Sequence, residues 1–246
     1  MIASVQREEP TPEASETRDS RASVEPLERV YVWDAVVRLT HWLIALSIVV
    51  LSVTGIHLGH PFIGPSDVPG RMVTANVRVI HLYAAIVFSL AVLVRLAWMF
   101  TGPPQARWHQ FLPVTSTRMR DLVRTLSFYL FLRRSPPGGL GHNPLAGVAY
   151  LLVYGLCLVM IATGLGLHAP DAGVSYMRQL GFLLALFGGA QTARLVHHVV
   201  MWLLIGFFAH HIWSTILMSI FERAGLVDSM VSGYKFILRD EAHRDR

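Results

Sequence analysis

Four histidines in apolar stretches long enough to cross a lipid bilayer are the residues of this chain best suited to chemistry. They are His41, His81, His197 and His211. An ionisable side chain within hydrocarbon is costly unless it is paired, hydrated or bound to a metal, so its presence there indicates a function. Imidazole is a frequent metal ligand, and four imidazoles suffice for two haem irons with two axial ligands each. The alternative for each histidine is a hydrogen-bonded contact between helices.

The spacing within the last apolar stretch selects two of its histidines. This stretch holds two adjacent pairs, His197-His198 and His210-His211. An α-helix turns by about 100° per residue, so a separation of 14 residues returns to within about 40° of the starting face, whereas separations of 13 and 12 end about 140° and 120° away. Only His197 and His211 therefore face the same side. Their rise of about 21 Å places two metal centres toward opposite edges of a hydrocarbon layer about 30 Å thick.

The composition predicts an integral membrane protein. Hydrophobic residues make up 53% of the 246 residues, charged residues only 15%, and the mean hydropathy is +0.46. A spanning helix needs about 20 mainly apolar residues. Four stretches meet this requirement: 33–58, 77–100, 145–167 and 195–221. We expect an all-α fold, a four-helix transmembrane bundle with short interfacial helices.

The rest of the chain is expected to flank this bundle, which forms one domain over residues 31–240. Residues 1–30 are acidic and almost free of aromatic side chains, which predicts a disordered tail. They lack the short apolar core of a secretory signal. Residues 241–246 form a C-terminal tail. Interfacial helices are expected at 120–134, 174–189 and 222–240, where apolar and charged residues mix over lengths too short to cross.

The threading of four spans suggests how the histidines pair. His41 near the start of the first span lies level with His211 near the end of the fourth, and His81 lies level with His197 at the other side. Two axial imidazoles leave iron no open position, so each haem would carry electrons rather than bind a small ligand. The single cysteine, Cys157, excludes a C-x-x-C-H covalent attachment, so the haems would be of b type.

Arginines in the loops predict the orientation. The connection between the second and third spans is rich in them: Arg107, Arg118, Arg120, Arg124, Arg133 and Arg134. The loops at the other side carry only Arg71, Arg78, Arg178 and Arg194. Since basic loops stay in the cytoplasm, both termini should be cytoplasmic. The net charge of +5 reflects this topology and indicates no nucleic-acid partner, because no nucleic-acid motif accompanies it.

Two further features of the spans suggest contacts with a haem. Arg38 precedes His41 by three residues, and Arg95 follows His81 by 14, so both arginines could bind haem propionates. Their alternative role is to reach the lipid headgroups. Thr54-Gly55 and Thr163-Gly164 recur at one level of the first and third spans. Their glycines could admit a macrocycle or another backbone, or could serve plain helix packing.

Several motifs of residues 31–240 resemble a known family. They are Arg38-Leu-Thr-His-Trp, Arg78-Val-Ile-His, Gly141-His-Asn-Pro-Leu-Ala, His197-His-Val-Val-Met-Trp and Ser229-Met-Val-Ser-Gly-Tyr. The chain resembles the b-type cytochrome subunit of membrane-bound nickel–iron hydrogenases. This family belongs to a wider group of dihaem cytochromes b that includes the gamma subunit of formate dehydrogenase. The histidine pattern is common to that group, and the last two motifs look specific to the hydrogenase branch.

The resemblance implies the same four histidine ligands that helical geometry selects. It also implies a quinone site on the cytoplasmic side at Asn143, and His142 beside it or a neighbouring acid could pass protons. His210 departs from the apolar residue usual beside the last ligand, which leaves His210 as the alternative to His211. The implied partners are the iron–sulfur small subunit of a hydrogenase and, through it, the large subunit, at the bacterial inner membrane.

The expected function is that of a membrane anchor and electron carrier. It would pass electrons from a periplasmic nickel–iron hydrogenase through two b-type haems to the quinone pool, with no catalytic residue of its own. One alternative is the same role for a formate or other periplasmic dehydrogenase. Another is a haem-free transporter or assembly factor whose histidines relay protons or bind nickel or zinc.

Overall fold

Four long helices dominate the computed structural model, which describes residues 27–63, 72–103, 106–108, 115–129, 132, 144–222 and 226–238. They are α2 (Ala35–Gly59), α3 (Val73–Thr101), α5 (Pro144–His168) and α8 (Ala190–Glu222). Each is long and apolar enough to cross a membrane. The predicted all-α bundle of four spans is confirmed, with α3 and α8 beginning four and five residues earlier than expected.

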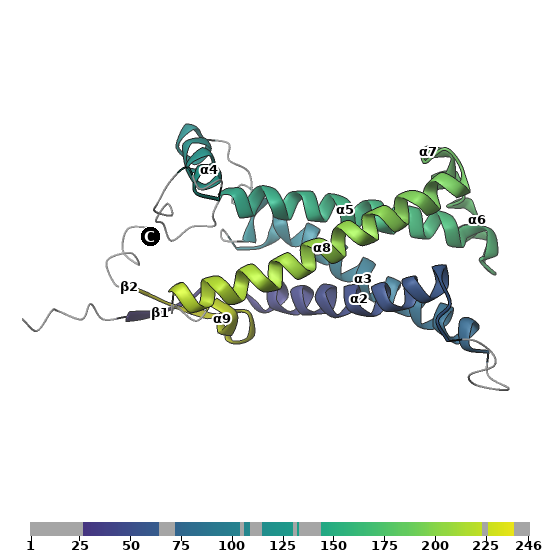
Figure 1. The fold of residues 1–246 in the computed structure, drawn as a ribbon, viewed down its shortest axis with the longest axis horizontal. Coiled ribbons are helices and arrows are strands. Elements are labelled where there is room, and N and C mark those ends of the chain that lie inside the picture. The colour runs from purple at the N-terminus through teal and green to yellow at the C-terminus, as the bar shows by residue number, and fades with distance from the viewer. Residues whose placement is uncertain are drawn as a thin grey trace, which may run out of the picture.

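The four helices form two hairpins that pack side by side (Figure 1). Helix α2 packs most extensively against α3, and α5 against α8, while the contacts of α2 with α8 and of α3 with α5 are fewer. Helix α8 lies beside α5 at one end of the bundle and approaches α2 at the other (Figure 1). Side chains from both hairpins therefore meet in the space between them.

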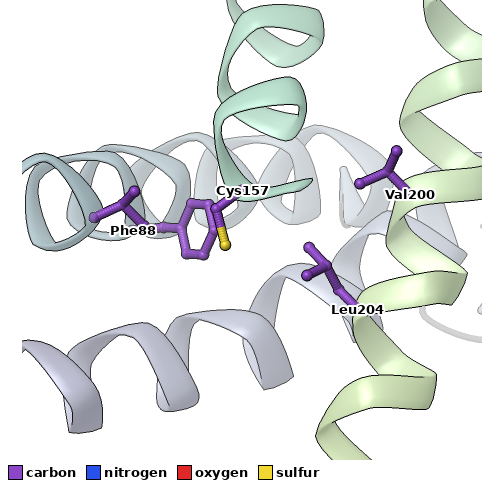
Figure 2. Close-up of a cluster of buried hydrophobic side chains, with 5 residues drawn as sticks. Phe88, Cys157, Val200 and Leu204 are labelled. Atoms are coloured by element: carbon purple, nitrogen blue, oxygen red, sulfur yellow. The ribbon is translucent and has the colours of Figure 1, made fainter. Parts of the chain in front are cut away.

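An apolar layer fills the middle of this space (Figure 2). Its fully buried members come from three helices: Phe88 and Val92 of α3, Cys157 of α5, and Val200 and Leu204 of α8. Leu204 is seven residues from His197 and seven from His211, so the layer lies midway between the two histidine levels. Cys157 serves here as a small buried apolar side chain.

Short helices cover both ends of the bundle (Figure 1). At one end lies α4 (Ser116–Tyr129), which begins before the interfacial helix expected at 120–134 and ends earlier. At the other end the 3-10 helix η3 (Ala169–Asp171) precedes α6 (Ser175–Gln179) and α7 (Phe182–Leu186). The expectation of one surface helix over 174–189 was wrong, because the chain turns at Leu180 and Gly181 and forms two.

The two ends of the described chain meet in a small sheet. Strand β1 (Leu27–Tyr31) pairs antiparallel with β2 (Tyr234–Leu238), which follows the short helix α9 (Leu226–Ser232). Two expectations were therefore wrong in part: residues 27–30 form part of a strand rather than of a disordered tail, and residues 222–240 are not one interfacial helix. Neither segment alone predicts a strand, because each acquires its backbone partners only from the other end of the chain.

The segment Ser229–Gly233, which we call the C-terminal clasp, holds the start of α2. Trp33 Nε1 donates to Ser229 Oγ at 3.2 Å and Trp42 Nε1 to the Met230 carbonyl at 3.1 Å. The Arg38 guanidinium donates to the Val231 carbonyl. The last of the family-like motifs thus has a structural role, which is to fasten the C-terminal segment beside His41.

Asp34 fastens the same end of α2 to α3. One of its carboxylate oxygens caps α2 by accepting from Val37 N at 2.9 Å, and the other accepts from Trp98 Nε1 at 2.9 Å. An N-cap of this kind stabilises a helix by about 1 kcal/mol. The first bond stabilises the start of the helix that carries His41, and the second joins that start to α3.

The clasp predicts a strong effect of a small substitution at Gly233. Its φ is +89°, and an added Cβ would lie 2.7 Å from Tyr31 Cε2 and 2.9 Å from the Trp33 carbonyl oxygen. Gly233→Ala should therefore lower the stability by roughly 1–3 kcal/mol. Thermal unfolding of the purified protein in detergent measures this as a lower midpoint.

Gly155→Ala is the matched control. Gly155 lies within α5, and an added Cβ there meets no atom within 4 Å. Alanine favours a helix over glycine, so this variant should be at least as stable as the wild type. Equal midpoints for the Gly233 and Gly155 variants would contradict the role of the clasp.

Candidate functional site

The structure brings His41 of α2 and His211 of α8 together. Their ring centroids are 6.2 Å apart and the rings are inclined by 60°. An imidazole nitrogen binds a transition metal ion at about 2 Å, so two rings sharing one ion have centroids about 6 Å apart. His41 Nδ1 is buried and has no hydrogen-bond partner among the described residues. The spacing and this unpaired nitrogen both fit a shared metal.

Helical geometry selected the histidine that faces His41 correctly. His211 is half-buried and its ring stacks on Phe207 at 5.7 Å, whereas His210 is exposed. His41 also contacts the Trp42 ring edge-on at 5.3 Å. Aromatic side chains thus limit the positions that both imidazoles can take. Haem ligation by this couple stays a prediction.

His81 of α3 and His197 of α8 occupy the second level, and each is held by a threonine. Thr54 Oγ1 of α2 lies 2.8 Å from His81 Nδ1, and Thr163 Oγ1 of α5 lies 2.8 Å from His197 Nδ1. Both threonines are buried. The two histidines are close enough to interact electrostatically. Since both bonds use Nδ1, the Nε2 atom of each ring is left for another partner.

The glycine beside each threonine lies next to the ring. A Cβ added at Gly55 would lie 3.5 Å from His81 Cε1 and 3.5 Å from Met201 Sδ of α8. One added at Gly164 would lie 3.4 Å from His197 Cε1. These are ordinary van der Waals distances, so the rings do not require glycine at either position. The residue of the repeated Thr-Gly that binds the imidazole is the threonine.

The predicted propionate-binding arginines lie in different surroundings. Arg38 is bound to the C-terminal clasp through Val231. Arg95 is only 5% exposed, and its guanidinium carbon lies 6.0 Å from the centre of the Tyr154 ring. Arg95 therefore does not reach toward the lipid headgroups, which excludes that alternative for it.

The predicted quinone-site residues and two further histidines lie outside the two histidine couples. Asn143 and His142, the predicted quinone-site residues, lie outside the described residues. His198 Nδ1 donates to the Arg194 carbonyl at 2.8 Å. His57 is fully buried against Phe62, a position that sequence reasoning did not single out.

Thr54 and Thr163 are the residues of the site that sequence reasoning missed. Their signal was the repeated Thr-Gly, which we interpreted through its glycines alone. The threonine contacts were hidden because they depend on the pairing of helices, which places α2 beside α3 and α5 beside α8.

The donor set limits the kind of metal that can bind. Over the described ranges, no group of three or more histidine, cysteine, aspartate or glutamate side chains could hold a metal ion. Two imidazoles alone are a poor site for a bare ion, but they complete the coordination of a metal that brings its own equatorial ligands. The iron of a porphyrin is such a metal. The residues present therefore fit haem and disfavour a structural zinc or nickel site.

Comparison with known proteins gives concordant matches over most of the chain. A profile of the family described as "Prokaryotic cytochrome b561" matches residues 32–233. A probable Ni/Fe-hydrogenase B-type cytochrome subunit of Cupriavidus necator is 34% identical over 219 residues, covering 87% of this chain and 90% of the relative. One from Azotobacter vinelandii is 34% identical over 230 residues, covering 92% and 96%. The probable Ni/Fe-hydrogenase 1 B-type cytochrome subunit of Escherichia coli K12 is 28% identical over 211 residues, covering 83% and 90%.

Proposed function

Since this chain belongs to the prokaryotic cytochrome b561 family, among the b-type cytochrome subunits of nickel–iron hydrogenases, we propose that it carries electrons from a hydrogenase across the membrane to quinone. Membership of this family implies bound haem. The observation that carries the proposal is the facing of His41 and His211 across the two hairpins, with ring centroids 6.2 Å apart. That spacing suits two imidazoles on opposite sides of one iron.

Each level of the bundle would hold one b-type haem. His41 and His211 would hold it at the cytoplasmic level, and His81 and His197 would hold it at the outer level. Such haems would supply reversible one-electron reduction, and with it a route for electrons from the outer level to the cytoplasmic one. The apolar layer around Leu204 keeps water from the space between the two levels.

Polar residues at the cytoplasmic level complete the proposed route. Arg95 and Arg38 bind haem propionates, for which a guanidinium offers two parallel hydrogen bonds. Arg95 supports this role because its charge is buried within the bundle at that level. Asn143 binds the quinone and His142 passes protons to it; both assignments rest on the family resemblance of the motif before α5.

The outer end of the bundle binds the hydrogenase small subunit. Helices α6 and α7 expose large apolar side chains there: Val174, Tyr176, Phe182 and Leu186. Large apolar and aromatic side chains of this kind form the centres of protein interfaces. We place this end on the periplasmic side, because the arginine-rich connection that contains α4 is at the opposite end (Figure 1).

Single histidine variants test the pairing of ligands. His41→Ala and His211→Ala should each remove the same spectral component and about half of the haem, because one ligand cannot hold the iron as two do. His81→Ala and His197→Ala should each remove the other component. Low-temperature difference spectra and haem content per chain measure both effects.

His210→Ala is the control, because this side chain is exposed beside His211. It should retain both components. Loss of both haems from every variant of a protein that still folds, or retention of both in all four ligand variants, would show that the pairing is wrong.

A charge on α7 tests the docking surface. Leu186 is 72% exposed. In membranes that contain the hydrogenase dimer, Leu186→Glu should slow the hydrogen-dependent reduction of the haems at least tenfold. The reason is that an unpaired charge buried in the interface opposes association. Reduction by dithionite should not change. Met119→Glu is the control, because Met119 is exposed on α4 at the opposite end, and it should leave both measurements as in the wild type. An equal loss of hydrogen-dependent reduction in both variants would contradict the assignment of the docking surface to α6 and α7.

A further inference from the structure

Two threonines hold the outer histidines in the same way in the two hairpins. In the first hairpin Thr54 of α2 bonds His81 of α3, and in the second Thr163 of α5 bonds His197 of α8, both at 2.8 Å. Both bonds lie within hairpins, between α2 and α3 in the first and between α5 and α8 in the second. Each threonine therefore fixes one imidazole from the other long helix of its own hairpin.

The direction of these hydrogen bonds follows from the threonine hydroxyls. Thr54 Oγ1 donates to the Val50 carbonyl at 2.7 Å, and Thr163 Oγ1 donates to the Val159 carbonyl at 2.7 Å. A hydroxyl has one hydrogen, so each threonine that donates to its own helix can only accept from the histidine. The histidine nitrogen that donates is Nδ1. Both rings are thus neutral tautomers with the hydrogen on Nδ1 and a free lone pair on Nε2.

This tautomer is the one that a metal ligand needs. Metal-binding histidines commonly donate their second ring N–H to an acceptor, which fixes the ring and raises the basicity of the ligating nitrogen. Each threonine therefore determines which nitrogen of its ring is left for a metal.

The cytoplasmic couple has no such arrangement in the part of the chain that the structure describes. His41 Nδ1 is buried without a hydrogen-bond partner there. Thr40, which precedes His41, makes the same bond to its own helix as Thr54 does, donating to the Val36 carbonyl at 2.7 Å, but no contact with a histidine is seen. The histidines of the two levels therefore differ in their hydrogen-bond partners.

We propose that Thr54 and Thr163 are positioning residues that set the reduction potential of the outer haem below that of the cytoplasmic haem. The inference rests on the proposed function, in which His81 and His197 are the outer ligands. A more basic imidazole favours the oxidised iron, so the threonine bonds lower the potential at the level where electrons enter. Electron transfer toward the cytoplasmic level is then downhill.

Valine variants test this inference, because valine has the shape of threonine but accepts no hydrogen bond. In the purified full-length protein, Thr54→Val and Thr163→Val should each shift the reduction equilibrium of the outer haem about tenfold toward the reduced form, equal to about 59 mV for a one-electron couple. The outer haem is the component that His81→Ala removes. Redox titration followed by visible spectra measures the shift, and electron paramagnetic resonance of the oxidised haem reports the ring orientation.

Two further variants separate the hydrogen bond from packing. Thr54→Ser and Thr163→Ser keep the hydroxyl and lose a methyl group, so they should restore the wild-type potential. Thr40→Val removes a buried hydroxyl that bonds only to its own helix, and it should leave the outer haem unchanged. If a valine variant does not accumulate, the alanine variant at that position takes its place in the comparison with serine.

The outcomes distinguish this inference from the proposed function. The role of the threonines would be overturned if the valine variants left the reduction potential of the outer haem unchanged, or if the serine variants shifted it as far as the valine variants do. Either result would leave the proposed two-haem cytochrome intact. A wild-type protein without haem would overturn the proposed function itself, and the threonine inference with it.

Discussion

The facing of imidazoles from different helices inside a lipid-spanning bundle is the interaction on which the rest of the structure depends. Histidine is costly in hydrocarbon unless it is paired, hydrated or bound to a metal. His81 and His197 are bonded to threonines, and His41 faces His211 at 6.2 Å. The two hairpins, the Asp34 cap and the C-terminal clasp hold the helices at the heights that these contacts require.

Helix α8 determines the order of the two histidine levels and the apolar layer along the bundle. Helix α8 carries a histidine at each level, with Leu204 of the apolar layer midway between them. Because α8 passes from the α5 side to the α2 side along its length (Figure 1), its two histidines face different helices. The bundle thus separates two sites of the same composition and gives each its own surroundings, with threonines at one and aromatic rings at the other.

The spans and the facing of His41 and His211 could be predicted from the sequence because both depend on local regularities: hydrophobic length and helical phase. The threonine contacts and the pairing of β1 with β2 could not, since they join segments far apart in the chain. The prediction for Arg38 was incomplete for the same reason, because its hydrogen-bond partner Val231 lies in the C-terminal clasp, far from Arg38 in the chain. Helices were expected near α4 and near α6 and α7, but their ends were wrong, since α4 begins at Ser116 and a turn at Gly181 divides α6 from α7. The expected helix at 222–240 was wrong, because β2 occupies its second half.

The central claim is that two imidazole couples each bind one haem. The most direct measurement is the haem content of the purified wild-type chain combined with the electron paramagnetic resonance spectrum of its oxidised form. The account predicts about two b-type haems per chain, both low-spin with two histidine ligands. A colourless protein, or iron with an open axial position at both levels, would contradict it.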